Sequence, residues 1–519
     1  MHDRRTRAFA GVLFTLCGSL FLMIVGNAQQ SGHPFSPTIP KTWDETALAD
    51  WATPVAGLNV RPTHISEKEY YSLRVENLRT YPVYVPGREP EGYWEMLQHV
   101  GPKPLIEPGK LNSEGDWIEA GRRVFEEADH LHLRTFDPTL IAAARNPETF
   151  TTALPDGTVN ARWVPTKEGV ALSFVNCSNC HLLYQADGAR VPGGSTFAIR
   201  RAPGTRSVGP SLINQVQSAK RVVTGGAPFI MGADSVGARL YQAFGVPWRK
   251  DDINERVKSL TEEEYLALSA NAVGRGGAVV RWNGSLYHPA KVPDLIGVKD
   301  RKYIDHTATH LHRGIGDLMR YAALVSFAEA SDWGPYHMLS PDTKRVQARL
   351  PDEALYALAL YIYSLQPPRN PNPFDEKARA GQDIFSRDVC TMCHTPPLYT
   401  SNKLTLAQGF TPPKDVPSTL DILPISVGTD PGLALGTRKG TGYYKVPSLK
   451  GVWYRGHYLH DGSVGSLEEM FDPDRLKDTH VPGGWSPPGT KSRAIKGHEF
   501  GLHLSVAERA ELIAFLRTL

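Results

Sequence analysis

Four of the five cysteines in the chain occur in two copies of one pattern. The pentapeptides CSNCH and CTMCH each hold two cysteines three positions apart and a histidine directly after the second. The residues concerned are Cys177, Cys180 and His181 in the first copy and Cys390, Cys393 and His394 in the second. Three kinds of site use cysteine pairs at this spacing: a four-thiolate zinc site, a redox-active dithiol and an attachment site for c-type haem.

The histidines favour the third kind of site. A zinc site made of the four thiolates would leave both histidines without a role. A redox dithiol needs one pair in a βαβ setting and no histidine in that place. In c-type attachment the two sulfurs bond the vinyl groups of haem and the histidine coordinates the iron. We therefore predict two covalently bound haem c groups, with His181 and His394 as proximal iron ligands.

The first 28 residues have the layout of a secretory signal peptide. Arginines precede an apolar run, and Gly26-Asn27-Ala28 resembles a small-residue cleavage site. The alternative is an uncleaved membrane anchor, because the apolar run approaches the length of a membrane span. Since c-type haem is attached outside the cytoplasm, we predict a periplasmic or secreted bacterial protein. Its membrane contact, if any, would be through this N-terminus.

Length and composition suit a globular protein of two or three domains. Of the 519 residues, 41% are hydrophobic and 21% are charged, and the 41 prolines and 47 glycines indicate many loops. The net charge of +3 provides no basic face for nucleic acid, so we expect no nucleic-acid partner.

An internal repeat indicates that the chain has two similar halves. Residues 292–306 and 446–460 agree at seven of fifteen positions, and each stretch follows its own cysteine pair. Upstream of the cysteines, residues 119–125 and 379–385 share a glycine and a phenylalanine four positions apart, on one face of a helix. Each half therefore has the parts of a cytochrome c domain, namely an entry helix, a haem motif, loops and a closing helix.

Both halves are predicted to end in that closing helix. Residues 350–368 place apolar side chains at helical spacing until Pro367 stops the pattern. In residues 504–519, Ser505 and Glu508 are placed as a capping box before an apolar run.

These patterns predict a mainly α fold with two cytochrome c-type haem domains in tandem, rich in loops and with small β-hairpin insertions. The predicted parts are a signal peptide or anchor (1–28), an N-terminal extension (29–110), an N-terminal haem domain (111–366), a linker (367–375) and a C-terminal haem domain (376–519). An insertion at 126–176 carries threonine and valine clusters that predict a hairpin.

The C-terminal half resembles the bacterial dihaem cytochrome c peroxidase superfamily. The resemblance is carried by RAGQDIF, CTMCHTPP, VPSLKGV, YLHDGS and LIAFLRTL, which together cover residues 375–519. The first half matches more loosely, through CSNCH and VPDLIGV. The superfamily also holds the dihaem enzyme that matures methylamine dehydrogenase and the dihaem rubber oxygenases. A large insertion, the N-terminal extension and a missing methionine favour the rubber-oxygenase-like branch.

The resemblance implies that the two haems divide the work. The C-terminal haem would be six-coordinate and transfer electrons, and the N-terminal haem would activate peroxide or O2. Peroxidases of this group take the sixth ligand from a methionine shortly before the last helix, where this chain has His498. We therefore expect His498 opposite His394, which should lower the reduction potential relative to histidine–methionine ligation. The alternative ligands are Met470, His480 and His503.

Candidates for catalysis at the N-terminal haem lie in residues 305–314. His306, His310 or His312 could ligate iron, hydrogen-bond a haem propionate or act as an acid–base group. A solvated loop is the alternative for His310 and His312. His306 repeats His460, so both are expected to hold their loops close to a haem.

An apolar, glycine-rich stretch at 225–248 could line a dry pocket at the N-terminal haem, with ordinary core packing as the alternative. The side chains concerned are Phe229, Met231, Phe244 and Trp248. Candidates for an aromatic bridge between the haems are Trp248, Trp282 and Trp453.

The sequence thus predicts a haem-dependent oxidoreductase and leaves three classes open. It could reduce peroxide with electrons from a redox donor protein, oxidise an apolar organic substrate with O2, or carry electrons without catalysis. Calcium is a further candidate cofactor.

Overall fold

The computed structural model describes the chain in segments. They are residues 35–56, 62–82, 84, 87, 89–129, 131–135, 142, 145, 162–167, 169–173, 177–195, 278–279, 287–326, 331–333, 336–337, 348–415, 420–437, 440–487 and 489–519. The predicted signal peptide, the apolar stretch 225–248 and Trp282 lie outside the described residues.

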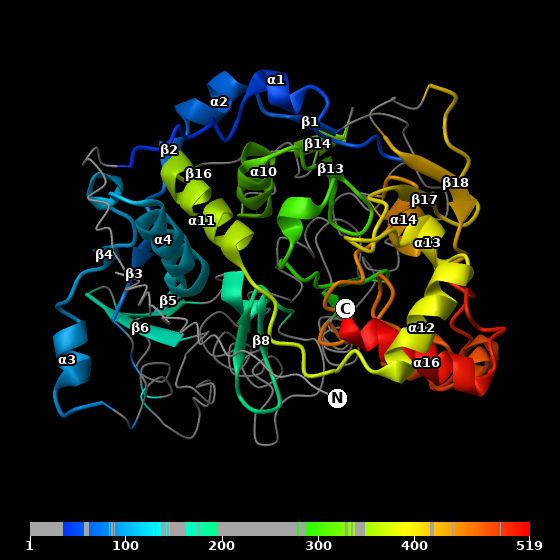
Figure 1. The fold of residues 1–519 in the computed structure, drawn as a ribbon. Helices are drawn as coiled ribbons and strands as arrows, with labels where there is room; N and C mark the ends of the chain where they lie inside the picture. The colour runs from blue at the N-terminus through cyan, green and yellow to red at the C-terminus, as the bar shows by residue number, and fades with distance from the viewer. Residues whose placement is uncertain are drawn as a thin grey trace, which may run out of the picture.

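Four helices form two pairs that organise the two halves (Figure 1). The N-terminal pair consists of α4 (Glu114–Glu127) and α11 (Asp352–Ser364). The C-terminal pair consists of α12 (Glu376–Arg387) and α16 (Val506–Thr518). These are the entry and closing helices expected of each half.

The ends of these helices follow from the residues that flank them. Ser113 caps α4, because its hydroxyl accepts a hydrogen bond from the Asp116 amide at 3.1 Å. Ser505 and Glu508 form the predicted capping box at the start of α16, where the Glu508 carboxylate accepts from the Ser505 amide at 3.0 Å. α11 ends shortly before Pro367, which lacks the amide that would continue the helix.

Each helix pair crosses at a glycine. A Cβ atom added to Gly121 of α4 would lie 1.9 Å from the carbonyl oxygen of Ala357 on α11. A Cβ atom added to Gly381 of α12 would lie 2.0 Å from the carbonyl oxygen of Glu511 on α16. Since no side chain fits at such distances, glycine is what allows the two backbones to meet.

The phenylalanine four residues after each glycine packs on the same partner helix. Phe125 contacts Tyr361, and Phe385 contacts Phe515, with ring centroids 5.3 Å apart in both pairs. The two halves therefore contain the same helix crossing, built on the glycine and phenylalanine that the repeat shares.

Small sheets connect the helices. The strands β5 (Leu131–Thr135), β7 (Gly169–Ser173) and β6 (Arg162–Thr166) form an antiparallel sheet with β7 in the centre. β6 and β7 pair as a hairpin with Thr166 opposite Gly169. A hairpin is thus present in the insertion for which the sequence predicts one.

The remaining elements are short. In the N-terminal extension they are α1 (Glu45–Leu48), β1 (Pro62–His64), α2 (Glu67–Ser72), β2 (Arg74–Val75), β3 (Arg79–Thr80), α3 (Tyr93–Leu97), β4 (Lys103–Pro104) and η1 (Pro108–Lys110). In the rest of the N-terminal half they are η2 (Cys177–Asn179), β8 (Leu182–Tyr184), β9 (Arg190–Pro192), β10 (Ala278–Val279), β11 (Ala290–Lys291), η3 (Val298–Asp300), β12 (Tyr303–Ile304), β13 (His310–Leu311), α10 (Ile315–Ser326), β14 (Ser331–Trp333), β15 (Tyr336–His337) and β16 (Ala348–Arg349). In the C-terminal half they are α13 (Cys390–Cys393), β17 (Leu404–Leu406), β18 (Ile422–Ser426), α14 (Gly432–Leu435), β19 (Tyr443–Lys445), α15 (Leu467–Met470) and η5 (Pro473–Leu476).

Among the described residues, no helix has both the length and the apolar character needed to cross a membrane.

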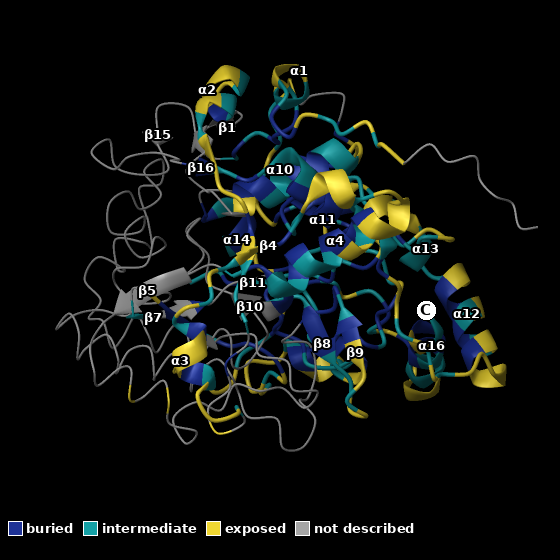
Figure 2. Cartoon of the chain, turned by 90° about the vertical axis from the view of Figure 1, so that its left-hand side faces the viewer, coloured by how far each residue is buried: buried dark blue, intermediate teal, exposed yellow. Residues whose placement is uncertain are grey.

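The N-terminal extension packs onto the N-terminal half through buried aromatic side chains. Trp43, Trp51 and Tyr70 belong to the hydrophobic core that also holds Phe125 of α4 and Leu358 of α11. Figure 2 shows exposed residues on the outer sides of α2 and α12 and buried residues toward the interior. The extension is therefore part of the folded molecule along most of its described length.

The two halves share that core. Leu404, Leu420, Tyr443 and Tyr454 of the C-terminal half belong to the same hydrophobic cluster as the side chains of α4 and α11. A second cluster lies between α12 and α16. The contact between the halves thus includes a shared apolar core.

Candidate haem sites

The second cysteine motif lies on the wall of a cavity in the C-terminal half. α13 is a single helical turn directly after α12, and both of its cysteines line the cavity. The His394 amide donates to the carbonyl oxygen of Cys390 at 2.8 Å, which places the His394 imidazole on the same wall. Burial raises the pKa of the Cys390 thiol to about 11, so the free sulfur is a neutral thiol at neutral pH.

The surroundings of the His394 imidazole fix its orientation and its protonation state. Its Nδ1 lies 3.2 Å from the carbonyl oxygen of Tyr399. Burial lowers the pKa of His394, which keeps the ring neutral at physiological pH. A neutral ring that donates its Nδ1 hydrogen to a carbonyl keeps a lone pair on Nε2, as metal-binding histidines commonly do.

His498 faces His394 across this cavity. The centroids of the two rings are 6.3 Å apart and the ring planes meet at 52°. An imidazole nitrogen binds a transition metal at about 2 Å, so two rings on opposite sides of one ion have centroids about 6 Å apart. Burial and the neighbouring His394 lower the pKa of His498 to about 4, and the ring is neutral. The spacing and protonation of the two histidines fit one iron ion between them.

A fully buried arginine fixes the loop that carries His498. The guanidinium of Arg475 donates to four carbonyl oxygens at 2.5 to 3.0 Å, those of Met470, Ile495, Gly497 and His498. Two of these oxygens belong to His498 and the residue before it. The sequence motifs contain no signal for Arg475, because its partners are distant in the chain and meet it only after folding.

The backbone at His498 is unusual. Its φ of 49° lies in the left-handed region, which few residues other than glycine adopt. Gly497 before it has φ 82°, and a Cβ there would lie 2.2 Å from the Thr429 amide nitrogen. The His498 amide donates to the carbonyl oxygen of Val427 at 2.6 Å. A residue in this conformation is strained, and the contacts of Gly497 and the hydrogen bond to Val427 hold it in place.

The other candidate ligands of the C-terminal iron are placed differently. His480 is hydrogen-bonded to a glutamate at 2.7 Å, and His503 is exposed. Met470 lines the cavity but packs within the apolar cluster between α12 and α16. Among the four candidates, His498 is the residue whose ring stands opposite His394.

Two groups of side chains line the cavity, which we call its apolar wall and its polar wall. The apolar wall consists of Phe385, Val452, Leu467, Met470, Phe471, Leu512 and Leu516. The polar wall consists of Lys291, His306, Tyr444, Lys445, Arg455 and His460. This lining fits haem, because haem is a flat apolar macrocycle with two carboxylates.

Two of the predicted histidines lie in the polar wall. His460 stacks on Tyr444 with ring centroids 4.4 Å apart, and its Nε2 is 3.2 Å from the Tyr444 hydroxyl. The Nε2 of His306 lies 2.7 Å from the carbonyl oxygen of Lys291. Burial lowers the pKa of His306 to about 3, so the neutral ring donates to that oxygen. Both histidines therefore hold loops at the C-terminal cavity, whereas the sequence places His306 among the candidates at the N-terminal haem.

The other two histidines of that segment lie in separate environments. His310 is buried against Trp51, with ring centroids 3.9 Å apart. The Nδ1 of His312 is 2.7 Å from the carbonyl oxygen of Arg301, and its Nε2 is 2.6 Å from the Tyr363 hydroxyl. Burial lowers the pKa of His312. The structure thus distributes the three candidate catalytic histidines over three environments instead of gathering them at one site.

The first cysteine motif shares one backbone hydrogen bond with the second, although it forms the 3-10 turn η2 where the second forms α13. The His181 amide donates to the carbonyl oxygen of Cys177 at 3.0 Å, as His394 does to its own motif. Cys177 packs against the core of the N-terminal half, and burial raises the pKa of its thiol to about 12. The carbonyl oxygen of His181 accepts from the Gly193 amide at 2.8 Å. Residues 196–277, which follow in the chain, lie outside the described part.

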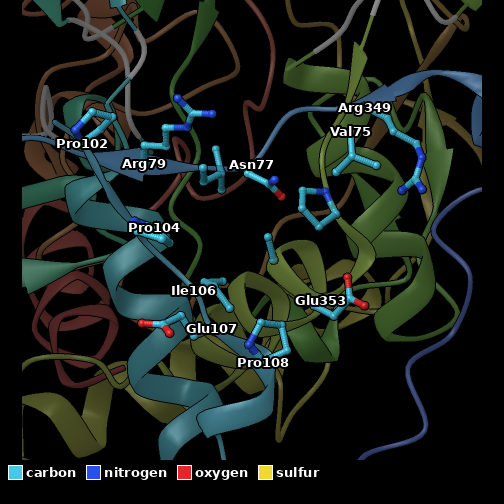
Figure 3. A pocket seen from close by; sticks show the side chains of 13 residues that line it. Val75, Asn77, Arg79, Pro102, Pro104, Ile106, Glu107, Pro108, Arg349 and Glu353 are labelled. Atoms are coloured by element: carbon cyan, nitrogen blue, oxygen red, sulfur yellow. The ribbon is translucent and has the colours of Figure 1, made fainter.

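A further pocket lies between the N-terminal extension and the start of α11 (Figure 3). Its volume is about 750 Å³, and prolines and aliphatic side chains form much of its lining. The charged side chains on it are Arg79, Glu107, Arg349 and Glu353, and its described lining includes no cysteine or histidine. It therefore offers no ligands for haem iron.

Two other candidates from the sequence can be placed in part. Trp453 packs against the core shared by the two halves, with its ring 5.2 Å from that of Tyr454. For calcium, no group of three or more histidine, cysteine, aspartate or glutamate side chains in the described segments is placed to hold a metal ion.

Part of this chain is similar in sequence to a known protein. Over 76 residues, or 15% of this chain, the sequence is 38% identical to the methylamine utilization protein MauG of Methylorubrum extorquens. The chain spans 18% of the length of that relative. No protein-family model matches the chain. The similarity is local, and it gives the rubber-oxygenase branch no support.

Two solved structures show a weaker likeness. A MauG-like protein associated with microbial copper homeostasis has a TM-score of 0.26 and 18% identity, over 44% of this chain and 73% of that one. Hydrazine synthase of Kuenenia stuttgartiensis has a TM-score of 0.26 and 17% identity, over 64% of this chain and 98% of that one. A TM-score of 0.26 is too low to indicate a shared fold or function.

Proposed function

We propose that the protein is a dihaem c-type cytochrome that acts as an oxidoreductase of the dihaem peroxidase type. The observation that carries the proposal is the pair of His394 and His498, which face each other at the spacing of one iron beside a cysteine pair. Haem held by both of these histidines would suit electron transfer, because the chain would leave no position for an oxidant on that iron.

The residues that would hold the two groups follow from the two motifs. Bound haem would supply a one-electron redox centre at the C-terminal site and a centre that activates an oxidant at the N-terminal site. The cysteines would form the thioether bonds and the histidines would ligate iron: Cys390, Cys393, His394 and His498 in the C-terminal half, and Cys177, Cys180 and His181 in the N-terminal half. The apolar wall of the C-terminal cavity would exclude water from the first of these centres.

The oxidant, the partners and the location are further parts of the proposal. The resemblance to dihaem peroxidases supports H2O2 as the oxidant, with electrons from a redox donor protein. The alternative reaction is oxidation of an apolar organic substrate by O2, as in the rubber oxygenases. It is supported by the insertion and the N-terminal extension alone. A periplasmic location rests on the signal-like first 28 residues.

A second candidate function is electron transfer without catalysis. It is favoured by the paired histidines of the C-terminal site, because ligation of that kind at both irons would leave no open position. The two candidate functions then differ in whether the N-terminal haem would keep an open coordination position.

Peroxide turnover by the holoprotein with a reduced donor tests the proposal. We expect turnover by the natural protein and its loss in the double variant Cys177→Ala, Cys180→Ala, because the N-terminal site would lack its haem. Retention of one covalent haem per chain with an unchanged low-spin spectrum is the control for folding. Turnover that survives in the double variant contradicts the assignment of the reaction to the N-terminal site, and a natural protein without turnover supports the electron carrier.

A further inference from the structure

The polar wall of the C-terminal cavity carries more positive charge than the protein itself balances. We infer that Lys291, Lys445 and Arg455 form a carboxylate-binding site for the propionates of the haem attached to Cys390 and Cys393. The inference rests on the proposed function, and it adds a ligand-binding role for side chains of both halves.

The three cations line the cavity, and the protein does not satisfy all of their hydrogen-bond donors. Lys291 Nζ donates to the carbonyl oxygen of Arg455 at 3.1 Å, and Lys445 Nζ has a long contact of 3.4 Å with the carbonyl oxygen of Tyr303. Arg455 donates from one terminal nitrogen to the carbonyl oxygen of Ser448 at 2.8 Å. Its Nε is buried and has no hydrogen-bond partner among the described residues.

Few carboxylates reach these cations. Asp294 lies 3.9 Å from Arg455, and it is shared with Arg301 at 3.7 Å. Asp305 acts on Lys445, but its oxygens also accept hydrogen bonds from the hydroxyls of neighbouring threonines and a tyrosine. Burial of unbalanced charge is costly. An anion bound in the cavity would therefore stabilise the cations of the polar wall.

Burial and the neighbouring arginines already lower the pKa of the two lysines. The pKa of Lys291 is lowered to about 8 and that of Lys445 to about 7. Both side chains nevertheless keep some accessible surface, because they line the cavity. A carboxylate placed there would stabilise both ammonium groups.

Haem offers the matching arrangement of groups. Its two propionates lie on one edge of the ring, and the rest of the ring is apolar. With the ring between His394 and His498, the apolar part would lie against the cluster of α12 and α16 and the carboxylates against the cationic wall. The polar and apolar walls of one cavity thus accommodate the two sides of one ligand.

The internal repeat explains how the wall arises. Lys291 directly precedes the repeat segment 292–306, and Lys445 directly precedes 446–460. The Lys291 amide donates to the carbonyl oxygen of His460 at 2.8 Å, and the Lys445 amide donates to that of His306 at 3.1 Å. The two copies therefore pair reciprocally, each lysine with the histidine of the other copy. The N-terminal half supplies Lys291 to the C-terminal cavity through this pairing.

The test uses the full-length holoprotein with both haems attached. We expect Lys445→Met to lower the equilibrium constant for reduction of the low-spin haem about tenfold, which is a potential shift of about 59 mV for one electron. Resonance Raman bands of the propionates should change in the same variant. Lys291→Met should act in the same direction, and Lys445→Arg should restore both signals.

Lys450→Met is the matched control, because Lys450 is exposed in the same loop, and it should change neither signal. Unchanged potential and unchanged Raman bands in both Lys445→Met and Lys291→Met would overturn the inference. A potential that responds to added phosphate or acetate while the propionate bands stay constant would also overturn it, because the wall would then bind a free anion. The proposed function fails separately, if the natural protein lacks a low-spin signal from a haem with two histidine ligands.

Discussion

Arg475 shows how a single buried side chain can fix the loop that carries a proposed iron ligand. It holds four carbonyl oxygens, two of which belong to Gly497 and His498. Burial lowers the pKa of its guanidinium. The four carbonyl acceptors nevertheless hold the group in place, and it fixes the loop in turn. We regard Arg475 as a positioning residue for His498.

Replacing Arg475 with methionine should therefore affect both stability and ligation. Loss of the charged donor leaves carbonyl oxygens buried without partners, which should reduce the free energy of unfolding by about 3 kcal/mol. The low-spin spectrum of the C-terminal haem should weaken as His498 moves away. Denaturant unfolding and optical spectra of the holoprotein provide the two measurements.

The matched control is Arg387→Met, since Arg387 forms an exposed ion pair with Glu508. It should cost less than about 1 kcal/mol and leave the spectrum unchanged. If Arg475→Met behaves like this control, Arg475 does not position His498.

Residue types and spacing could predict part of the candidate site. The cysteine motifs place His181 and His394 by adjacency alone, and His498 was expected from its place before the last helix. The partners of the sites could not be predicted in this way. Arg475, Lys291 and Lys445 act through contacts between distant segments, and no local pattern encodes which lysine of a loop will face a cavity.

At the scale of elements, the crossing of α12 and α16 sets the shape of the C-terminal site. α12 leads directly into the turn of Cys390, and α16 contributes Leu512 and Leu516 to the cavity wall. The crossing depends on Gly381, whose Cα lies against the backbone of α16. A change in the distance between the helices would therefore alter the cavity.

Gly381→Ala should destabilise the protein by about 3 kcal/mol, because the added methyl group has no space and the helices must separate. Gly115→Ala in α4 is the control: its Cβ would meet only the Ser113 hydroxyl oxygen at 3.6 Å. Alanine there should raise stability by up to about 1 kcal/mol through helix propensity. Thermal or denaturant unfolding measures both, and equal effects of the two substitutions would contradict the role of the crossing.

The closing helices could be predicted from the sequence better than the short strands could. The capping box of Ser505 and Glu508 and the stop at Pro367 located the closing helices, because caps act within a few residues. The short strands that pair across the chain, such as β2 with β16, gave no such signal. Pairing between two-residue strands depends on the tertiary structure that brings them together.

At the scale of the whole molecule, the two halves meet through equivalent parts. The core joins Tyr443 and Tyr454 to the side chains of α4 and α11, and the repeat loops pair through Lys291 and Lys445. The equivalent helix crossings and reciprocal loops are what a duplicated unit would retain. The division of labour proposed for the two halves then rests on the ligands that each half provides to its iron.

The most direct test of the account is electron paramagnetic resonance of the oxidised holoprotein and its His498→Ala variant. The natural protein should show a low-spin haem with two histidine ligands, and the variant should lose that signal while both haems remain covalently attached. His503→Ala, which removes an exposed histidine of the same segment, should leave the spectrum unchanged. A His498→Ala variant that keeps the low-spin six-coordinate signal would contradict the pairing of His394 and His498 on which the proposal depends.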